Sequence, residues 1–454
     1  MAAGRHAAAE DLLRRALALR KQAVDTHATV QTVTRLGAAL LWARHPDRAL
    51  EVLEPAVGEF ADLAPDPAFV ALEAQYGRAL FLSDEFRRAL EVMERVLEAA
   101  ERADLVGVLA DALVTRGSAL GFVGRIREGL GVIEIGERLA RTNGLTSTLM
   151  RAINNRASSL YDFDPPATIE LTREGLELAR RVGDRGALFA MRGLLGFGLQ
   201  LTADLDGALA SFEAGLAEEP EPADALVLAD GVIIVRAARG EAVAEQLAEL
   251  ERLAVGITDS NTAWTTVDAP AWVAFCDGRF DEAARRWREG AARMPGVAPG
   301  WLPAAGSASL ASGDAAGAAS HLAALDATGL HTPALELHRG RLRAGIAALE
   351  GRSSDAARGY RDALQGMLDL GLAWDHALAT VEMAVVMGHS DPVVGAAVAI
   401  ARPVLERARA APFLARLDAA LGRSAAEPPP PTRTSGTTDA GTPEAARNAS
   451  IAPS

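Results

Sequence analysis

Small residues recur at a constant interval along the first third of the chain. Glycine or alanine stands at four positions that are 40 residues apart, namely Gly37, Gly77, Gly117 and Ala157. Twelve residues after each of the first three comes another glycine or alanine, and mostly apolar residues follow four and seven positions later. Positions with this spacing lie on one face of an α-helix. Each copy therefore predicts two antiparallel helices that cross where small residues let their backbones approach.

The same offsets continue with looser spacing toward the C-terminal part. Their first small residues are Gly196, Gly231, Ala271, Gly306, Ala344 and Ala384. The copy that begins at Ala157 is degenerate, because Ile169 replaces the second small residue and Pro165 and Pro166 distort the turn before it. Short polar turns with Asp, Ser or Gly separate the predicted helices, and these residues cap helix starts or end helices.

One copy matches a known repeat at every diagnostic place. Ala271, Ala283, Trp287, Gly290 and Pro295 occupy the two small positions, the bulky position, the third small position and the terminal proline of the motif. The segment resembles the tetratricopeptide repeat, although the period of 40 exceeds the usual length of about 34 residues. The resemblance implies an all-α fold, a right-handed α-solenoid of about nine to ten helical hairpins.

This interpretation divides the chain into three parts. Counting back 40 residues from Ala49 gives Ala9, so residues 1–26 are predicted to form a partial repeat or capping helix. Such an opening fits either an ordinary end cap or descent from a longer protein. The superhelix is predicted over residues 27–423. Residues 424–454 contain the run Pro428–Pro431 and no apolar periodicity, which predicts a disordered tail.

The last third carries a second, narrower resemblance. Trp374-Asp375-His376 and the segment Ala411-Pro412-Phe413 are similar to the C-terminal ends of bacterial signalling proteins. In those proteins tetratricopeptide arrays follow an AAA-type or STAND-type ATPase, sometimes with a class III adenylate or guanylate cyclase domain. No segment of this chain corresponds to the ATPase or the cyclase domain itself.

The amino-acid composition limits the classes of partner that the protein can bind. Acidic residues outnumber basic ones 60 to 46, which gives a net charge of −14 and argues against nucleic acid and anionic membranes as partners. Cys276 is the single cysteine, so no intramolecular disulfide can form. The sequence shows no signal peptide and no apolar run of the length that spans a bilayer. We expect a cytoplasmic protein.

The sequence also argues against catalysis. Lys21 is the only lysine and lies outside any GxxxxGK[ST] pattern, which excludes the usual phosphate-binding, kinase and Schiff-base lysines. The eight histidines form no HExxH pair. We therefore predict no enzyme activity, no cofactor and no metal site.

An α-solenoid instead offers a concave groove lined by the first helix of each hairpin. The resemblance implies which positions face that groove, and carrying them across gives a set of candidate peptide-binding residues. These are Arg78, Arg151, Asn154, Tyr161, Asp268 and Trp272. An asparagine amide can pair with a peptide backbone, and an aromatic ring supplies contact area at low entropic cost.

Two functions remain open at this point. The first is a non-catalytic protein–protein interaction scaffold that binds a protein or peptide in the groove. The second is a regulatory or sensor module that acts with a separate signalling ATPase, nucleotide cyclase or transcriptional regulator. The identity of the partner, the direction of regulation and the oligomeric state do not follow from the sequence.

Overall fold

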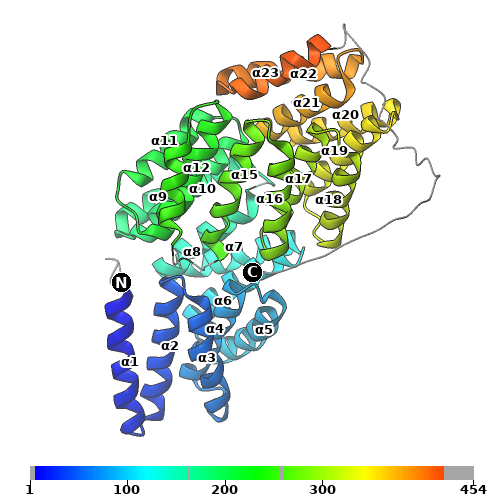
Figure 1. Cartoon of the computed structure of the whole chain (residues 1–454). Helices are drawn as coiled ribbons and strands as arrows, with labels where there is room; N and C mark the ends of the chain where they lie inside the picture. Colours follow the sequence, from blue (N-terminus) through cyan, green and yellow to red (C-terminus); the bar gives the residue numbers. More distant parts are fainter. Residues whose placement is uncertain (1–5, 162, 256, 258–259, 424–454) are drawn as a thin grey trace, which may run out of the picture.

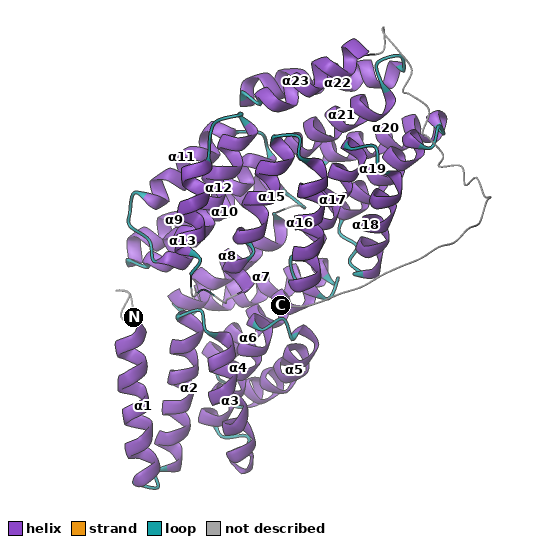
Figure 2. Ribbon diagram, in the orientation of Figure 1, coloured by secondary structure: helices purple, strands orange, loops and turns teal. Residues whose placement is uncertain are grey.

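The computed structural model describes residues 6–161, 163–255, 257 and 260–423, and within them it contains helices and loops but no strand (Figure 2). The helices have these bounds: α1 (His6–Gln22), α2 (Thr26–Trp42), α3 (Pro46–Glu59), η1 (Ala61–Leu63), α4 (Pro67–Leu82), α5 (Phe86–Arg102), α6 (Val106–Phe122), α7 (Ile126–Thr142), α8 (Thr146–Leu160), α9 (Pro165–Val182), α10 (Arg185–Leu201), α11 (Leu205–Leu216), α12 (Pro222–Ala238), α13 (Ala244–Leu253), α14 (Ser260–Ala263), α15 (Thr265–Cys276), α16 (Phe280–Arg293), α17 (Ala298–Ala311), α18 (Ala315–Ala327), α19 (Pro333–Leu349), α20 (Ser353–Asp369), α21 (Ala373–Met387), α22 (Pro392–Ala408) and α23 (Ala411–Arg423).

The helices pair as consecutive hairpins along the described chain. Pairs run from α2–α3 to α12–α13, and from α15–α16 to α21–α22 after the short helix α14. Helix α1 packs against α2 and helix α23 against α21, so a single helix stands at each end of the array. The predicted fold class, an all-α array of tetratricopeptide-like hairpins, is confirmed.

The predicted crossing points are places of close backbone approach. A Cβ atom built on Gly117 in α6 would lie 2.6 Å from the carbonyl oxygen of Gly129 in α7, and one on Gly129 would lie 2.4 Å from the oxygen of Gly117. No side chain larger than hydrogen fits at either position unless the backbones move. The periodic small residues therefore mark the sites where the two helices of a hairpin touch, as the sequence predicted.

Two copies of the repeat are shifted by one residue from the predicted register. In the hairpin α8–α9, Thr168 and Thr172 of α9 are fully buried, whereas Arg173, which the repeat spacing places at the contact, is exposed. The hydroxyl of Thr168 donates to the carbonyl of Ala157 at 3.2 Å, so the turn before α9 is one residue tighter than in the other copies.

The hairpin α21–α22 is displaced by one residue in the opposite direction, toward later positions. Ala397 and Ala401 face the core, and the predicted contact residue Ile400 is 48% exposed. In both shifted copies the second helix starts at a proline, Pro165 or Pro392, whose fixed φ suits the first helical position. The prediction of the exact contact residues was therefore wrong in these two copies, although the hairpins exist.

The array winds back on itself. Figure 1 shows the chain running from α1 and α2 at the lower end of the molecule to α22 and α23 at the upper end. Helix α21 also contacts α10 and α17, and α23 contacts α12, although these helices are far apart in the sequence. The C-terminal helices therefore pack across the inner side of the central hairpins, and this arrangement encloses the site described below.

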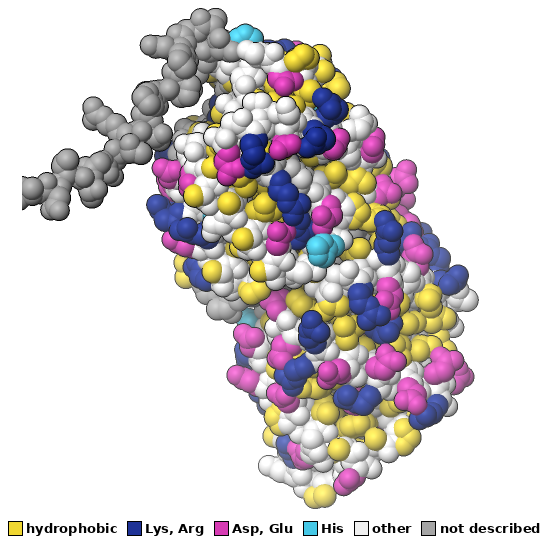
Figure 3. All heavy atoms as spheres, turned by 90° about the vertical axis from the view of Figure 1, so that its right-hand side faces the viewer, with side chains coloured by type: hydrophobic (Ala, Val, Ile, Leu, Met, Phe, Trp, Pro, Cys, Tyr) yellow, Lys and Arg dark blue, Asp and Glu magenta, His cyan; other side chains and the backbone are white. Residues whose placement is uncertain are grey.

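On the face shown in Figure 3, acidic and basic side chains are interspersed rather than gathered by sign. Within the described residues, no helix combines the length and the apolar character that a membrane crossing requires. The predicted disordered tail, residues 424–454, lies outside the described residues.

Candidate functional site

A cavity of about 1540 Å³ lies on the inner side of the array. It is lined mainly by the first helices of the hairpins from α4 to α21, together with α23. Pockets for drug-sized ligands have about 300–1,000 Å³, so this cavity has room for a larger ligand. Its walls come from residues as far apart in the sequence as Phe81 and Ala420, and only the winding of the array brings them together.

Aromatic side chains gather at this cavity although they form only 5% of the sequence. Eight of them line it, namely Phe81, Phe122, Tyr161, Trp272, Phe275, Phe280, Trp287 and Phe413. The rings of Trp272 and Phe275 stack at a centroid distance of 5.7 Å, and Phe413 from α23 lies 5.9 Å from Trp272. Flat rings of this kind supply large contact areas with little side-chain entropy to lose.

Arg416 joins the last helix to this aromatic wall. Its guanidinium lies over the rings of Phe275, Phe280 and Phe413, with centroid distances of 5.2, 4.9 and 5.2 Å. It also donates to the main-chain carbonyls of Phe275 and Cys276 at the C-terminal end of α15, where the helix dipole favours a cation. Burial lowers the pKa of Arg416. These contacts fix α23 against α15 and so help to form one side of the cavity.

A buried ion pair occupies the opposite side. Arg341 from α19 donates to Glu382 from α21 and to the hydroxyl of Ser307 on α17, and its second terminal nitrogen donates to the carbonyl of Pro303 at 3.3 Å. The hydroxyl of Tyr360 donates to Oε1 of Glu382 at 2.9 Å. The charges of Arg341 and Glu382 therefore compensate each other. Together these hydrogen bonds connect α17, α19, α20 and α21.

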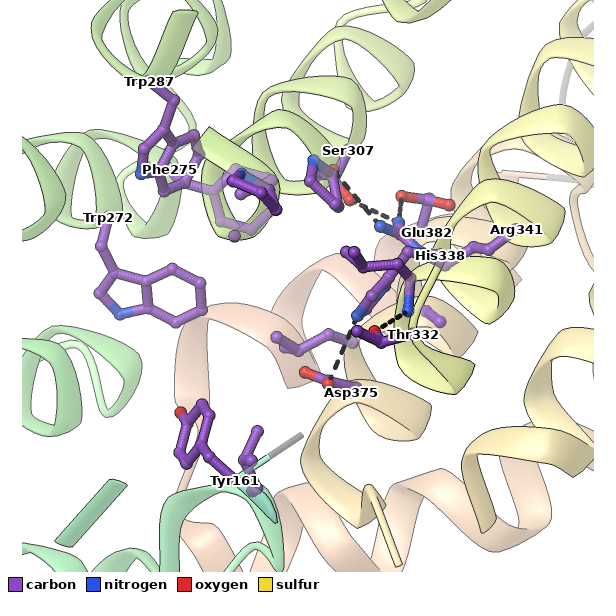
Figure 4. A pocket seen from close by; sticks show the side chains of 18 of the residues that line it. Tyr161, Trp272, Phe275, Trp287, Ser307, Thr332, His338, Arg341, Asp375 and Glu382 are labelled. Carbon is purple, nitrogen blue, oxygen red and sulfur yellow. Dashed lines mark hydrogen bonds and ion pairs between the residues drawn. The ribbon is translucent and has the colours of Figure 1, made fainter. Parts of the chain in front are cut away.

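His338 lies one turn before Arg341 on the same helix. Its Nε2 is 3.7 Å from Oδ2 of Asp375, and its buried Nδ1 has no hydrogen-bond partner. Burial, together with the nearby charge of Arg341, lowers the pKa of His338 to about 3. The imidazole is therefore neutral at physiological pH. Figure 4 shows this polar group facing the aromatic group Trp272, Phe275 and Trp287 across the cavity.

Amide and hydroxyl groups form a third part of the wall. Nδ2 of Asn155 donates to the hydroxyl of Ser118 at 2.8 Å, and Nδ2 of Asn154 donates to Oδ1 of Asn155 at 3.2 Å. Both asparagines stand on α8, and Ser158 follows one turn later. Neutral groups that both donate and accept suit the amide groups of a peptide backbone.

The structure separates the six residues predicted from the sequence. Asn154, Tyr161 and Trp272 line the cavity, and Figure 4 shows Tyr161 and Trp272 close to one another there. Arg78 lines a smaller pocket among the N-terminal hairpins. The peptide-binding role of these residues stays a prediction.

Two of the six are engaged elsewhere. Arg151 forms an ion pair with Asp111 at 2.7 Å and lines neither pocket. Asp268 accepts a hydrogen bond of 3.0 Å from Nε1 of Trp287 on the second helix of its own hairpin and does not line the cavity. An acidic side chain at a groove position is thus directed toward α16 because a tryptophan of that helix offers a donor.

The sequence analysis missed the polar wall contributed by the later hairpins. Ser307, His338 and Arg341 occupy the same groove positions, relative to Gly306 and Ala344, that indicated Trp272, Arg151 and Asn154, respectively, in earlier copies. Extending the same offsets to the later copies would have found all three. Phe413 and Arg416 belong to the unpaired helix α23, for which the repeat pattern has no position.

Within the described residues the cavity holds no arrangement typical of covalent or metal chemistry. No group of three or more His, Cys, Asp or Glu side chains there could hold a metal ion. The thiol of Cys276 is buried, and burial raises its pKa far above the usual range, which opposes thiolate formation. The side chains at the cavity are suited to contact and hydrogen bonding.

No family model matches the sequence, and no curated protein matches it. Among solved structures, the chain is similar to a Rap protein complexed with competence and sporulation factor, with 11% identity, 87% of this chain and 98% of that chain covered, and a TM-score of 0.47. Yeast Tom70 has 12% identity, coverage of 87% and 96%, and a TM-score of 0.33. The Cut9–Hcn1 hetero-tetramer of the APC/C has 14% identity, coverage of 91% and 96%, and a TM-score of 0.33.

The fold assignment rests on the helices themselves. Consecutive hairpins cross at small residues and expose their first helices on a common inner side. The chain is an all-α array of tetratricopeptide-like helical hairpins whose inner side encloses a large aromatic and polar cavity.

Proposed function

We propose that this chain is a cytoplasmic, non-catalytic interaction protein of the tetratricopeptide type that binds a peptide or an extended protein segment in the central cavity. The observation that carries the proposal is the composition of the cavity. One wall is aromatic, the opposite wall is polar with a compensated ion pair, and a third presents amides and hydroxyls. A peptide offers the same combination of apolar side chains and backbone amides.

The size of the cavity supports the same ligand class. A volume of about 1540 Å³ exceeds that of the usual small-molecule pocket and suits a ligand of several amino-acid residues. Because the walls come from many hairpins, an extended ligand contacts several first helices at once. Each contact adds a little to affinity, and together they select a sequence.

Selection of peptides against the intact chain tests this proposal. A displayed library of random peptides is selected on the full-length protein, and the affinities of the selected peptides are then measured by fluorescence anisotropy. We expect Tyr161→Ala and Trp272→Phe to weaken binding at least about 10-fold, which corresponds to about 1.4 kcal/mol. Exposed Arg87 on α5, which lines neither pocket, provides the control Arg87→Ala.

The outcomes are distinct. Peptides that bind wild type and the Arg87→Ala protein alike, but bind the two cavity variants weakly, support the proposal. If the selection yields no binder, or if the selected peptides bind both cavity variants as tightly as wild type, the central cavity is not a peptide site. Circular dichroism of each variant checks that the fold is retained.

A second candidate function is favoured by the way the cavity is closed. Its walls combine central hairpins with α21 and α23, so an occupant touches both the early and the late part of the array. We propose as the alternative a regulatory module that transmits occupancy to a separate signalling ATPase, nucleotide cyclase or transcriptional regulator. Cross-linked capture from the native cytoplasm tests this function: recovery of such a protein with wild type but not with Tyr161→Ala supports it, and equal recovery with both proteins contradicts it.

A further inference from the structure

A second, smaller pocket lies among the N-terminal hairpins. It has a volume of about 290 Å³ and is lined by α2, α4 and α6 together with the start of α8. It shares no lining residue with the central cavity. Its size suits a single functional group of a ligand rather than a whole drug-sized molecule.

Arg78 on α4 is the central charge of this pocket. Its guanidinium lies over the ring of Trp42 on α2, with 5.4 Å from Cζ to the ring centroid. Among the described residues, that guanidinium forms no hydrogen bond and no ion pair. Burial and the nearby charge of Arg151 lower the pKa of Arg78 to about 10, so the side chain is still a cation at neutral pH.

The nearest carboxylate is already engaged. Asp111 on α6 pairs with Arg151 at 2.7 Å and accepts a hydrogen bond of 3.4 Å from the hydroxyl of Thr148. Arg151 in turn donates to Thr115 at 2.9 Å. Asp111 therefore pairs with Arg151 and not with Arg78, and the three groups together carry one net positive charge in a protein whose net charge is −14.

Gln75 adds an unused amide to the same pocket. It stands one turn before Arg78 on α4, and its Oε1 is buried without a hydrogen-bond partner. A half-buried cation and an unpartnered amide both cost folding free energy unless something compensates them. Uncompensated buried charges and unpartnered buried polar atoms are common where a protein binds a ligand.

We propose that this pocket binds an oxyanion, either a carboxylate or a phosphate group, with Arg78 as its principal ligand. The planar guanidinium can donate two parallel hydrogen bonds to such a group, and its contact with the ring of Trp42 leaves these donors unused. The buried Oε1 of Gln75 is an acceptor, so it suits an N–H or O–H group of the same ligand rather than the oxyanion itself. Trp42 is 39% exposed, so its ring also offers an apolar surface to the rest of the ligand.

Titration with two simple anions tests the proposal. Inorganic phosphate is followed by phosphorus NMR line width, and acetate by saturation transfer to its methyl protons, both at constant ionic strength. We expect saturable binding in the millimolar range, with Arg78→Gln weakening it about 10- to 100-fold. Trp42→Leu provides a second variant, and Arg87→Gln is the matched control.

The ratio of the two affinities identifies the source of the anion. Phosphate binding at least about 10-fold tighter than acetate indicates a phosphoryl group, and similar affinities indicate a carboxylate. The proposal is overturned if neither anion binds, or if Arg78→Gln and Trp42→Leu both bind like wild type. The proposal is also overturned if Tyr161→Ala abolishes anion binding, because the anion then occupies the central cavity. Anion titration gives this result whether or not the central cavity binds peptides.

Discussion

The first hairpins and the later ones are built from the same repeat but hold together differently. From α2 to α6 the buried apolar residues form one cluster that runs from Val30 to Ala112 and contains only neighbours along the chain. The cluster of the later part joins Met150 to Ala420 and includes residues from α8 as well as α23. Charged side chains are buried there too, with Arg341, Glu382 and Asp230 as examples.

The difference shows how an array of similar hairpins can enclose a cavity. Stacking on neighbours is sufficient for stability in a solenoid, and it produces a similar surface at each step. In the later part the array turns back, and residues that are unrelated in the repeat pattern come to face each other. The large cavity arises mainly there, whereas among the N-terminal hairpins the smaller pocket of Arg78 is found.

The apolar core of the early hairpins contains only neighbours along the chain, although Arg44, before α3, also forms an ion pair with Asp224 on α12. The strongest test of this neighbour-only core is a substitution at a backbone crossing. In Gly129→Val the new side chain meets the carbonyl oxygen of Gly117, since a Cβ alone would lie 2.4 Å from it. We expect a loss of about 4 kcal/mol or more in the free energy of unfolding, measured with denaturant. Hydrogen exchange should speed up in α6 and α7 and stay unchanged in α19 to α22, if the early hairpins depend on their neighbours alone.

The same helix offers a matched control. A Cβ on Gly131 would have no heavy atom within 4 Å, so Gly131→Ala should stabilise α7 by about 0.5–1 kcal/mol. An unchanged unfolding transition in Gly129→Val would contradict the crossing assignment, and faster exchange throughout the chain would contradict the neighbour-only description.

A smaller effect is expected from breaking the buried ion pair of the later half. Arg341→Met leaves Glu382 buried without its cation, which should cost about 3 kcal/mol of unfolding free energy. The double variant Arg341→Met with Glu382→Leu should recover most of this loss, because no unpaired charge remains. Arg343→Met, an exposed change on the same helix, should alter stability by no more than about 0.5 kcal/mol. A single variant as stable as wild type would show that the pair does not connect α19 to α21 energetically.

The smallest effect concerns Asp230 on α12, whose carboxylate oxygens are both buried without a partner. Burial, and secondarily the charge of Asp268, raise the pKa of Asp230 well above its usual value. The folded protein therefore binds this proton more tightly than the unfolded chain. The resulting stability is fully present below the unfolded pKa of about 4 and is lost as pH rises through the folded pKa.

Replacing this carboxyl should remove that pH dependence. We expect Asp230→Asn to gain stability relative to wild type as pH increases above about 4, by about 1–2 kcal/mol at pH 8. Denaturant unfolding at several pH values measures the difference, and Asp362→Asn, at an exposed position on α20, is the control. A difference that does not change with pH would show that Asp230 is ionised in the folded protein.

The comparison also explains which features the sequence could predict. Small residues at Gly117 and Gly129 have one packing role, so their spacing revealed the hairpins directly. The contact residues of α9 and α22 were misplaced by one position, in opposite directions, because the turn before each helix differs in length from the turns of the regular copies and the spacing of small residues does not reveal this. Phe413 and Arg416 could not be found by periodicity, since their contacts depend on how far the array winds before it meets itself. The hydrogen bond between Asp268 and Trp287 lies within one hairpin, but helical spacing alone does not say that these two side chains pair.

The contact of Arg416 with α15 can form only after α23 has been synthesised. Arg416 donates to carbonyls that precede it by 141 and 140 residues, and it forms part of the cavity wall. Hairpins of a solenoid can fold one after another as they leave the ribosome. The cavity wall must instead be completed late, when α23 has emerged and docked. A chain shortened by proteolysis within α23 would keep folded N-terminal hairpins and lose the wall that Phe413 and Arg416 provide.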